Sequence, residues 1–414
     1  MNNTVALPLD LAFVRSHFPA LSGDCVFFDN AGGSQVLKGV VDRISDYLLT
    51  TNVQQGASYP VAIRSGERLR AAQAEVATLI GASRPEEVVM GPSSTLLLQL
   101  LARAMAKQFR PGDEVIVTRF DHESNIGPWV GLESLGVVVK FWELDTETLA
   151  LDLGALDRLI TDRTRLVCVT HASNILGSVT PVAEITRLVH ARGAQVCVDG
   201  VALAPHRAVD VQAWDVDYYV LSFYKVYGPH HAVLYGKYEH LRRLANLYHY
   251  FIPDDRIPYK LQPGNPNYEL SYGCGGIVDY LGELGVRTGA AGSAPLRKRI
   301  ETAFVAIAHH EEALAERLLG YLRSKAGVRI IGAPRAEPTR VPTISFTASN
   351  KDPEAIVRHI DGRGLGIRFG DFHSRRLVDR LGLSPRKGVV RVSMVHYNTL
   401  EEVDRLIQGF EGVL

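Results

Sequence analysis

A lysine and an aspartate follow two strongly apolar segments in the middle of the chain. Lys225 comes just after YYVLSF (218–223), and Asp199 lies near the end of AQVCVDG (194–200). Burial at the end of a strand would lower the pKa of the lysine and leave an amine able to attack a carbonyl carbon. A buried aspartate can keep a pyridine nitrogen protonated. Each residue also has an ordinary interpretation: a lysine whose ammonium reaches solvent, and an aspartate that caps a helix or a turn.

Hydroxyl groups and a histidine follow two further apolar segments. Ser93, Ser94 and Thr95 stand between VVMGP and an apolar pattern of helical spacing. Hydroxyl groups at a helix N-terminus suit a phosphate, but they also suit plain N-capping. His122 follows DEVIVTRF (113–120) and could stack on a ring or move a proton. Taken alone, such a histidine is more often a loop residue with satisfied hydrogen bonds.

An asparagine and an arginine complete the candidate set. Asn174 lies three residues beyond RLVCVTH (165–171), where it is either a turn former or a hydrogen-bond donor. Arg391 lies at the start of RVSMVHYN, as an ion-pair residue or as a clamp whose guanidinium fork matches a carboxylate. Together these residues match pyridoxal 5′-phosphate (PLP), which has one phosphate, one ring face, one phenolic oxygen, one ring nitrogen and one aldehyde.

The segments that precede these residues predict a mostly parallel sheet. Apolar runs at 88–91, 113–120, 137–144, 165–171, 194–200, 217–223 and 231–236 are continuously hydrophobic, as strands buried on both faces must be. Helical patterns separate several of them, so we expect an α/β fold with helices on both sides of a seven-stranded sheet. Ligands of such sheets bind beyond the carboxyl ends of the strands, where the polar residues above occur.

The pattern changes near residue 290. A long amphipathic helical stretch is followed by VRIIG, VPTISFTAS, a helix from Asp352 to about Gly362, VVRVSMVHYN and a last helix with a Thr399/Glu402 capping box. We therefore predict a large domain at 21–290, a smaller α+β domain at 291–414, and an N-terminal segment, 1–20, packed on the smaller domain.

Composition excludes several classes of protein. The 414 residues include 45 basic and 45 acidic side chains, and a nucleic-acid-binding surface usually needs a basic excess. No apolar run is long enough for a membrane helix, and the N-terminus does not resemble a signal peptide. Four scattered cysteines without C-x-x-C fit a reducing cytoplasm rather than a disulfide framework or zinc ribbon. No P-loop or H-E-x-x-H occurs, and we predict no metal site.

Over nearly its whole length the chain resembles the class V aminotransferases, which are fold-type I PLP enzymes, and within them the cysteine desulfurase and selenocysteine lyase branch. The resemblance is to a divergent, desulfurase-like group of that branch. The segments that carry it are FFDNAGG (27–33), FDHESNIGPW (120–129), HASNILGSVTPV (171–182), CVDG followed by HRAVDVQ (206–212), SFYKVYGP (222–229) and VVRVSMVHYNTLEEVDRL (389–406).

The resemblance implies a role for each candidate residue. Lys225 would form the Schiff base, Asp199 would pair with the pyridinium nitrogen, and His122 would stack on the ring. The remaining cofactor contacts would come from Asn174 to the phenolic oxygen, and from Ser94, Thr95, Ser222 and, across the interface of a homodimer, Asn265 to the phosphate. The substrate side would be formed by Arg391 on the α-carboxylate, together with Asn30, Ala31 and His373.

Four departures from the family pattern bear on the reaction. Ala202 stands where many desulfurases carry glutamine, and Tyr224 replaces the usual histidine before the lysine. Asn265 stands where the family often has threonine. The loop that carries the persulfide-forming cysteine corresponds to RFGDFHSRR (368–376), which has none and places His373 nearby. Of the four cysteines, Cys168 and Cys197 are predicted to be buried strand residues, and Cys274 is the one candidate for a reactive thiol.

These features favour an enzyme that acts on an α-amino acid with a leaving group on Cβ, most simply sulfur. Without a thiol on the loop, elimination of a sulfur group fits better than persulfide transfer. Two alternatives stay open at this point. One is an aminotransferase or related α-carbon chemistry such as decarboxylation or epimerisation. The other is a non-catalytic PLP-binding paralogue.

Overall fold

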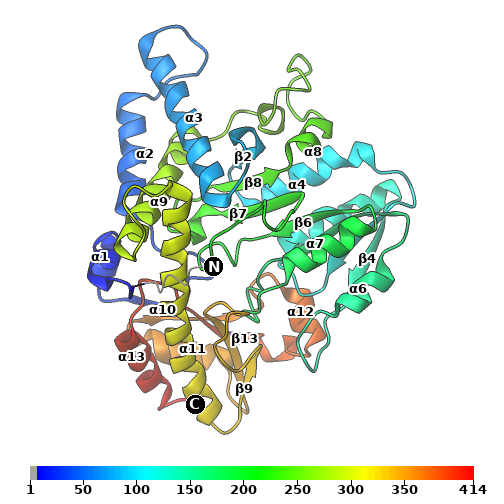
Figure 1. Cartoon of the computed structure of the whole chain (residues 1–414). Helices are drawn as coiled ribbons and strands as arrows, with labels where there is room; N and C mark the ends of the chain where they lie inside the picture. Colours follow the sequence, from blue (N-terminus) through cyan, green and yellow to red (C-terminus); the bar gives the residue numbers. More distant parts are fainter. Residues whose placement is uncertain (1–6) are drawn as a thin grey trace.

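Seven strands form the central sheet of the computed structural model, which describes residues 7–414 (Figure 1). Their spatial order is β2-β8-β7-β6-β5-β3-β4. The strands are β2 (Val88–Gly91), β3 (Glu114–Thr118), β4 (Val138–Trp142), β5 (Thr164–Thr170), β6 (Gln195–Asp199), β7 (Tyr218–Ser222) and β8 (Ala232–Gly236). Six of the seven fall within the apolar segments and β5 begins one residue earlier, at Thr164, so the predicted strands are confirmed.

One strand runs against the rest. The pairs from β4 to β7 are parallel, whereas β8 is antiparallel to both β7 and β2. The connection between β7 and β8, residues 223–231, is too short for the crossover that two neighbouring parallel strands require. The sheet is therefore mostly parallel, as expected.

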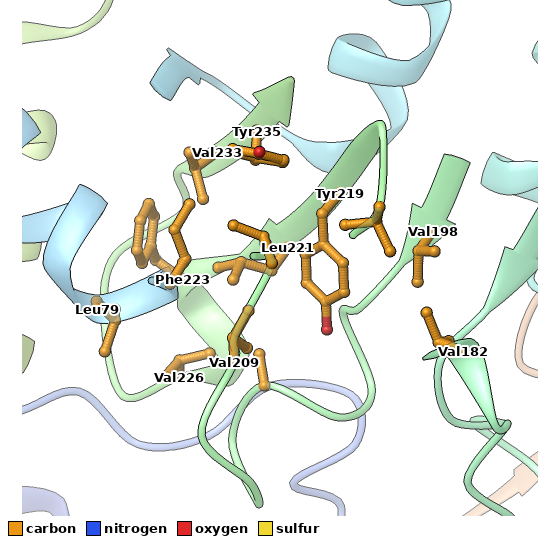
Figure 2. Packing of buried hydrophobic residues seen from close by; sticks show 14 of the residues in the cluster. Leu79, Val182, Val198, Val209, Tyr219, Leu221, Phe223, Val226, Val233 and Tyr235 are labelled. Atoms are coloured by element: carbon orange, nitrogen blue, oxygen red, sulfur yellow. The ribbon is translucent and has the colours of Figure 1, made fainter. Parts of the chain in front are cut away.

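Both faces of the sheet are buried, which explains the continuous apolar runs. On β7, Tyr219 and Leu221 join one apolar cluster with Val198 of β6 (Figure 2). Val220, which points the other way, joins a second cluster with Leu97 of α4. Alternate residues of a strand point to opposite faces, so a strand covered by helices on both sides needs apolar residues at every position.

Helices cover these faces and continue into the C-terminal part of the chain. α2, α3, α9 and α10 pack against one another beside the sheet (Figure 1). The helices are α1 (Leu11–Ser16), α2 (Lys38–Thr50), α3 (Pro60–Ile80), α4 (Ser94–Met105), α5 (Gly127–Val130), α6 (Leu153–Leu159), α7 (Val182–Ala191), α8 (Tyr238–Arg243), α9 (Tyr268–Arg287), α10 (Leu296–Ser324), α11 (Pro353–Asp361), α12 (Arg375–Arg380) and α13 (Leu400–Phe410). None of those in residues 7–414 is long and apolar enough to cross a membrane.

The C-terminal part has its own antiparallel sheet and apolar cluster. The strands are β9 (Val328–Ile331), β10 (Thr343–Ala348), β12 (Arg368–Gly370) and β13 (Val389–Ser393), in the order β12-β13-β10-β9. A separate parallel pair joins β1 (Val26–Phe27) to β11 (Leu365–Gly366). The predicted capping box of the last helix is confirmed, because Thr399 and Glu402 cap each other's backbone N–H groups.

The N-terminal segment contacts more than one part of the fold. Residues 1–6 of the predicted segment 1–20 lie outside the described residues. Arg15 of α1 forms an ion pair with Glu402 of α13 at 2.8 Å, and the Phe13 ring lies parallel to that of Tyr280 in α9. The limits of the domains at residues 20 and 290 stay a prediction.

Gly200 directly follows β6, and a substitution there tests how closely side chains pack next to Asp199. A Cβ atom on Gly200 would lie 2.0 Å from the buried Tyr219 ring, so Gly200→Ala forces the ring or the backbone to move. We expect a loss of about 1–3 kcal/mol in the free energy of unfolding, measured by urea denaturation. Gly39→Ala in α2 is the matched control, since its Cβ meets nothing within 4 Å. Equal stability of the two variants would contradict the packing described here.

Candidate active site

One pocket beyond the strand ends collects most of the predicted residues. Lys225, Asp199, Asn174 and His122 line it together with hydroxyl-bearing side chains and a tyrosine. The latter are Ser93, Ser94, Thr95, Ser124, Thr170, Ser222 and Tyr224. These residues follow β2, β3, β5, β6 and β7, and thus meet only because the sheet aligns the ends of its strands.

Lys225 is buried in this pocket with 8% of its surface exposed, so its ammonium does not extend into solvent. Burial and the nearby charge of Arg391 lower the pKa of the amine to about 8, against the opposing charges of Asp199 and Asp29. Within residues 7–414 its Nζ has no ion-pair partner within 4.0 Å. The lysine therefore offers an amine that is easily deprotonated and free to react.

Asp199 is the last residue of β6 and is also buried. Its Oδ1 atom accepts a hydrogen bond from the backbone N–H of Val201 at 2.9 Å, which is the turn role that the sequence left open. Burial raises the pKa of the carboxyl group, while the charge of Lys225 opposes the shift. A buried carboxyl with an oxygen to spare suits a protonated ring nitrogen.

His122 is held as a neutral ring. Its Nδ1 atom accepts a hydrogen bond from the backbone N–H of Ser124 at 3.1 Å and lies 2.6 Å from the Ser124 hydroxyl oxygen, so the proton of the neutral ring is on Nε2. Burial first, and then the charges of Lys225, His373 and Arg391, lower its pKa to about 3. An uncharged imidazole of fixed orientation suits stacking against an aromatic ring.

The hydroxyl groups gather where α4 begins. Ser93 caps the helix by accepting the Leu96 N–H, as plain N-capping predicts, so it is Ser94 and Thr95 that are left for a ligand. The side-chain hydroxyls of Ser94 and Ser222 are hydrogen-bonded to each other across the pocket. Hydroxyls and free N–H groups at a helix N-terminus favour a phosphate. The pocket thus has a part for each group of PLP.

Arg391 does not line this pocket itself but contacts Asn174, which does. Nη1 of Arg391 donates to the Asn174 carbonyl at 3.2 Å, and Nη2 forms an ion pair with Asp29 at 2.8 Å. The arginine is 2% exposed, its Nε atom has no hydrogen-bond partner among the described residues, and its guanidinium lies 3.6 Å from the centroid of the Phe372 ring. Asn174 donates through Nδ2 to the Phe372 carbonyl at 2.9 Å and accepts through Oδ1 from Ser374.

The remaining predicted residues lie outside this pocket. Asn30 is buried, and its amide is used within the protein: Nδ2 donates to the carbonyls of Phe27 and Ser393, and Oδ1 accepts from Tyr397. The Ala31 N–H donates to the Ser393 hydroxyl at 2.8 Å. For both residues the structure shows contacts that tie the segment after β1 to β13, and a role in substrate binding stays a prediction.

Asn265 and His373 lie in two further places. Asn265 lines a separate cavity with Gln54 and Tyr268. His373 is exposed, and the centroid of its ring lies 5.2 Å from that of His122.

Two acidic residues near the site were not predicted. Asp29 forms an ion pair with Arg391, and burial raises the pKa of Asp121 to about 7. Their positions inside DNAGG and DHESN were the only signal in the sequence.

The cysteines lie away from the pocket. Cys168 and Cys197 are buried in β5 and β6, as predicted. Cys274, the one candidate for a reactive thiol, is buried in α9, and burial raises the pKa of its thiol well above the usual value, so the structure does not support that candidate role. Cys25 lines a different cavity next to β1. Among residues 7–414 no cluster of His, Cys, Asp and Glu side chains could hold a metal ion.

Comparisons with known proteins place this geometry in a family. The model of the class-V aminotransferases matches residues 26–304 and 296–406. The chain belongs to the class-V aminotransferase family. It is therefore a PLP-dependent enzyme of fold type I, and the predicted family, fold class and cofactor are confirmed.

Individual relatives point toward the desulfurase branch of this family. The chain is 43% identical to "Aminotransferase-like protein FGM3" of Gibberella zeae, over 97% of this chain and 98% of that protein. It is 32% identical to "Cysteine desulfurase-like protein ustD" of Aspergillus flavus, over 95% of this chain and 88% of that protein. The crystal structure of the cysteine desulfurase CsdA from Escherichia coli superposes with a TM-score of 0.82 at 26% identity, covering 98% of both chains.

The lowered pKa of Lys225 predicts how the rate of PLP capture depends on pH. The neutral amine is the reactive form, so the rate at which apoprotein binds PLP should rise about tenfold per pH unit at low pH and level off above pH 8, not near 10.5. Stopped-flow absorbance during reconstitution measures this rate. Asp199→Asn removes a charge that raises the lysine pKa, so its profile should level off at lower pH. A rate that keeps rising through pH 10 would contradict the burial of the amine.

Proposed function

We propose that this enzyme catalyses β-elimination on a cysteine-type α-amino acid and releases the sulfur group directly, without a persulfide on the protein. The observation that carries the proposal is a buried, unpaired Lys225 in a pocket that no cysteine lines. Persulfide transfer needs a thiol beside the substrate, and elimination does not. The similarity to proteins named cysteine desulfurase or cysteine desulfurase-like supports chemistry at a C–S bond.

Each side chain of the pocket has a role in this proposal. Lys225 would hold the PLP aldehyde through its amine, Asp199 would pair with the ring nitrogen, and His122 would stack on the ring. Ser94, Thr95 and Ser222 hold the phosphate, and Asn174 donates its second amide hydrogen to the phenolic oxygen. Bound PLP would withdraw electrons from the substrate Cα and so weaken the bonds to that carbon.

Arg391 binds the substrate α-carboxylate in this proposal. Its guanidinium is already paired with Asp29 through Nη2, while Nε is buried and without a partner. A substrate carboxylate would satisfy Nε and compete with Asp29 for Nη2. Because a guanidinium can bind a carboxylate through two parallel hydrogen bonds, the exchange favours a substrate that carries this group.

Lys225 then moves the proton that starts the elimination. The neutral amine of Lys225 would accept the proton on the substrate Cα, as a base with a pKa of about 8 can do near neutral pH. The electron pair of that C–H bond forms the Cα–Cβ double bond, and the Cβ–S bond breaks with its pair on sulfur. With water, the products are pyruvate, ammonia and a thiol or sulfide. No net oxidation occurs.

The products discriminate this reaction from its alternatives. Purified protein with PLP should convert cysteine, cystine or S-substituted cysteines to equal amounts of pyruvate and ammonia, followed with lactate dehydrogenase and by mass spectrometry. Lys225→Ala should lose at least about 10³-fold in rate, because it removes both the cofactor linkage and the base. The conservative Cys274→Ser variant should keep the wild-type rate.

Other products would contradict elimination in an informative way. Alanine formed from cysteine would indicate removal of sulfur without loss of the amino group. Accumulation of the pyridoxamine form with an amino donor would indicate an aminotransferase. No change of the cofactor spectrum with any amino acid would favour the non-catalytic paralogue.

We also propose that the enzyme works as a homodimer with the site near the subunit interface. In support, Asn265 does not line the Lys225 pocket of its own chain. It lines a separate cavity of about 700 Å³ on that chain. Ile63, which lines this cavity, is exposed; Tyr59, just before α3, and Tyr250 and Phe251, at 97% and 65%, are exposed as well. Apolar surface of this kind commonly marks an interface between proteins.

Light scattering on the eluting holoenzyme should give twice the mass of one chain. Replacing an exposed apolar residue of this surface by a charge, Ile63→Glu, should shift the mass toward that of one chain, because a charge buried at an interface costs free energy. Val305→Glu on α10, also exposed, is the control. A wild-type protein with the mass of one chain would contradict the dimer.

A further inference from the structure

The loop between β12 and α12 (residues 371–374) belongs to the segment that the resemblance aligns with the cysteine loop of desulfurases, and several contacts hold it in place. The Asn174 side chain binds it at two points, the Phe372 carbonyl and the Ser374 hydroxyl. The N–H of Glu123 donates to the His373 carbonyl at 2.8 Å. The Asp371 carboxylate accepts the N–H of His373 at 3.1 Å. The loop is thus fastened both to the pocket and to the segment that carries His122.

The backbone of the loop needs such support. Phe372 and His373 both have left-handed backbone conformations, with φ of 51° and 59°. Residues with a side chain rarely adopt this conformation, so neighbouring contacts must hold them there. Arg376, just beyond the loop, pairs with both carboxylate oxygens of Glu123 at 2.9 and 3.0 Å. A loop fixed in this way suits a group that acts from one position better than a thiol that carries sulfur to a distant acceptor.

The side chains of Phe372 and His373 lie next to two different residues of the site, Arg391 and His122. The Phe372 ring lies against the guanidinium of Arg391. The His373 ring lies 5.2 Å from the ring of His122, tilted by 49°, and is exposed where His122 is half-buried. The exposed imidazole therefore lies next to His122, one of the residues that line the pocket. The charged residues beside it include Asp371, which pairs with Arg375 at 3.7 Å, and Glu123 and Arg376, which pair with each other.

We propose that His373 is the proton donor to the sulfur that leaves Cβ, an inference that rests on the elimination proposed above. The protonated imidazole gives its proton to the departing sulfur as the Cβ–S bond breaks, so the product leaves as a thiol or hydrogen sulfide. Water then returns a proton to the imidazole, and the hydroxide that this leaves takes the proton that Lys225 accepted from Cα. Lys225 accepts the proton that leaves Cα, and His373 donates the proton that the sulfur receives. The two proton transfers are thus assigned to different residues.

Two substrates of similar size separate this role from a structural one. Sulfur in S-methylcysteine is a poor leaving group that needs a proton, whereas chloride in β-chloroalanine leaves without one. His373→Gln keeps a polar side chain of similar length but cannot act as the acid. We expect its kcat with S-methylcysteine to fall about 10²-fold, in the range usual for general acid catalysis, and its kcat with β-chloroalanine to stay within about threefold.

Controls distinguish the failure of this inference from the failure of the proposed function. His309→Gln, at an exposed position of α10, should match the wild type with both substrates. If the wild type releases pyruvate from both substrates and His373→Gln slows both equally, or neither, then His373 is not the acid and the elimination stands. If the wild type releases pyruvate from β-chloroalanine but not from any sulfur substrate, or from neither compound, the proposed function fails and this inference fails with it.

Discussion

The burial of one amine determines what the rest of the site has to do. Lys225 lies at the end of β7 with little contact to water, and its pKa falls to about 8 because the charged form is poorly solvated there. An ordinary lysine of the surface would be protonated at neutral pH and unable to attack an aldehyde. Asp199 and Asp29 limit the shift by favouring the charged form, and Arg391 increases it. With a pKa of about 8, the amine is present near neutral pH in both its charged form and its neutral, reactive form.

The sheet supplies the geometry that this burial needs. β5, β6 and β7 run parallel and are covered by apolar residues on both faces, so packing on two sides holds the strands whose ends form the site. Asp199 closes β6 and Lys225 follows β7, which brings the two charges into one pocket without a direct ion pair. Packing behind the site is equally close, since the Tyr219 ring leaves no room for a side chain at Gly200. Stability of the core and position of the site thus depend on the same residues.

The sequence was sufficient for the strands and for the residues that follow them. Continuous apolar runs require two buried faces, and this fixes which polar residues lie at the strand ends, Lys225 and Asp199 among them. It was not sufficient for contacts between distant segments. The pairing of Arg391 with Asp29, and the grip of Asn174 on the loop at Phe372, join residues far apart in the chain and leave no local pattern. The internal hydrogen bonds of Asn30 and the deep burial of Cys274 escaped prediction for the same reason.

The covalent link between Lys225 and PLP is the central claim, and reduction by borohydride tests it most directly. Treatment of the holoenzyme with borohydride fixes a Schiff base as a stable amine, and peptide mass spectrometry then locates it. The account predicts the phosphopyridoxyl group on the peptide that contains Lys225, in an amount equal to the protein. Its appearance on another lysine, or its absence from every peptide of a protein that holds PLP, would contradict the account.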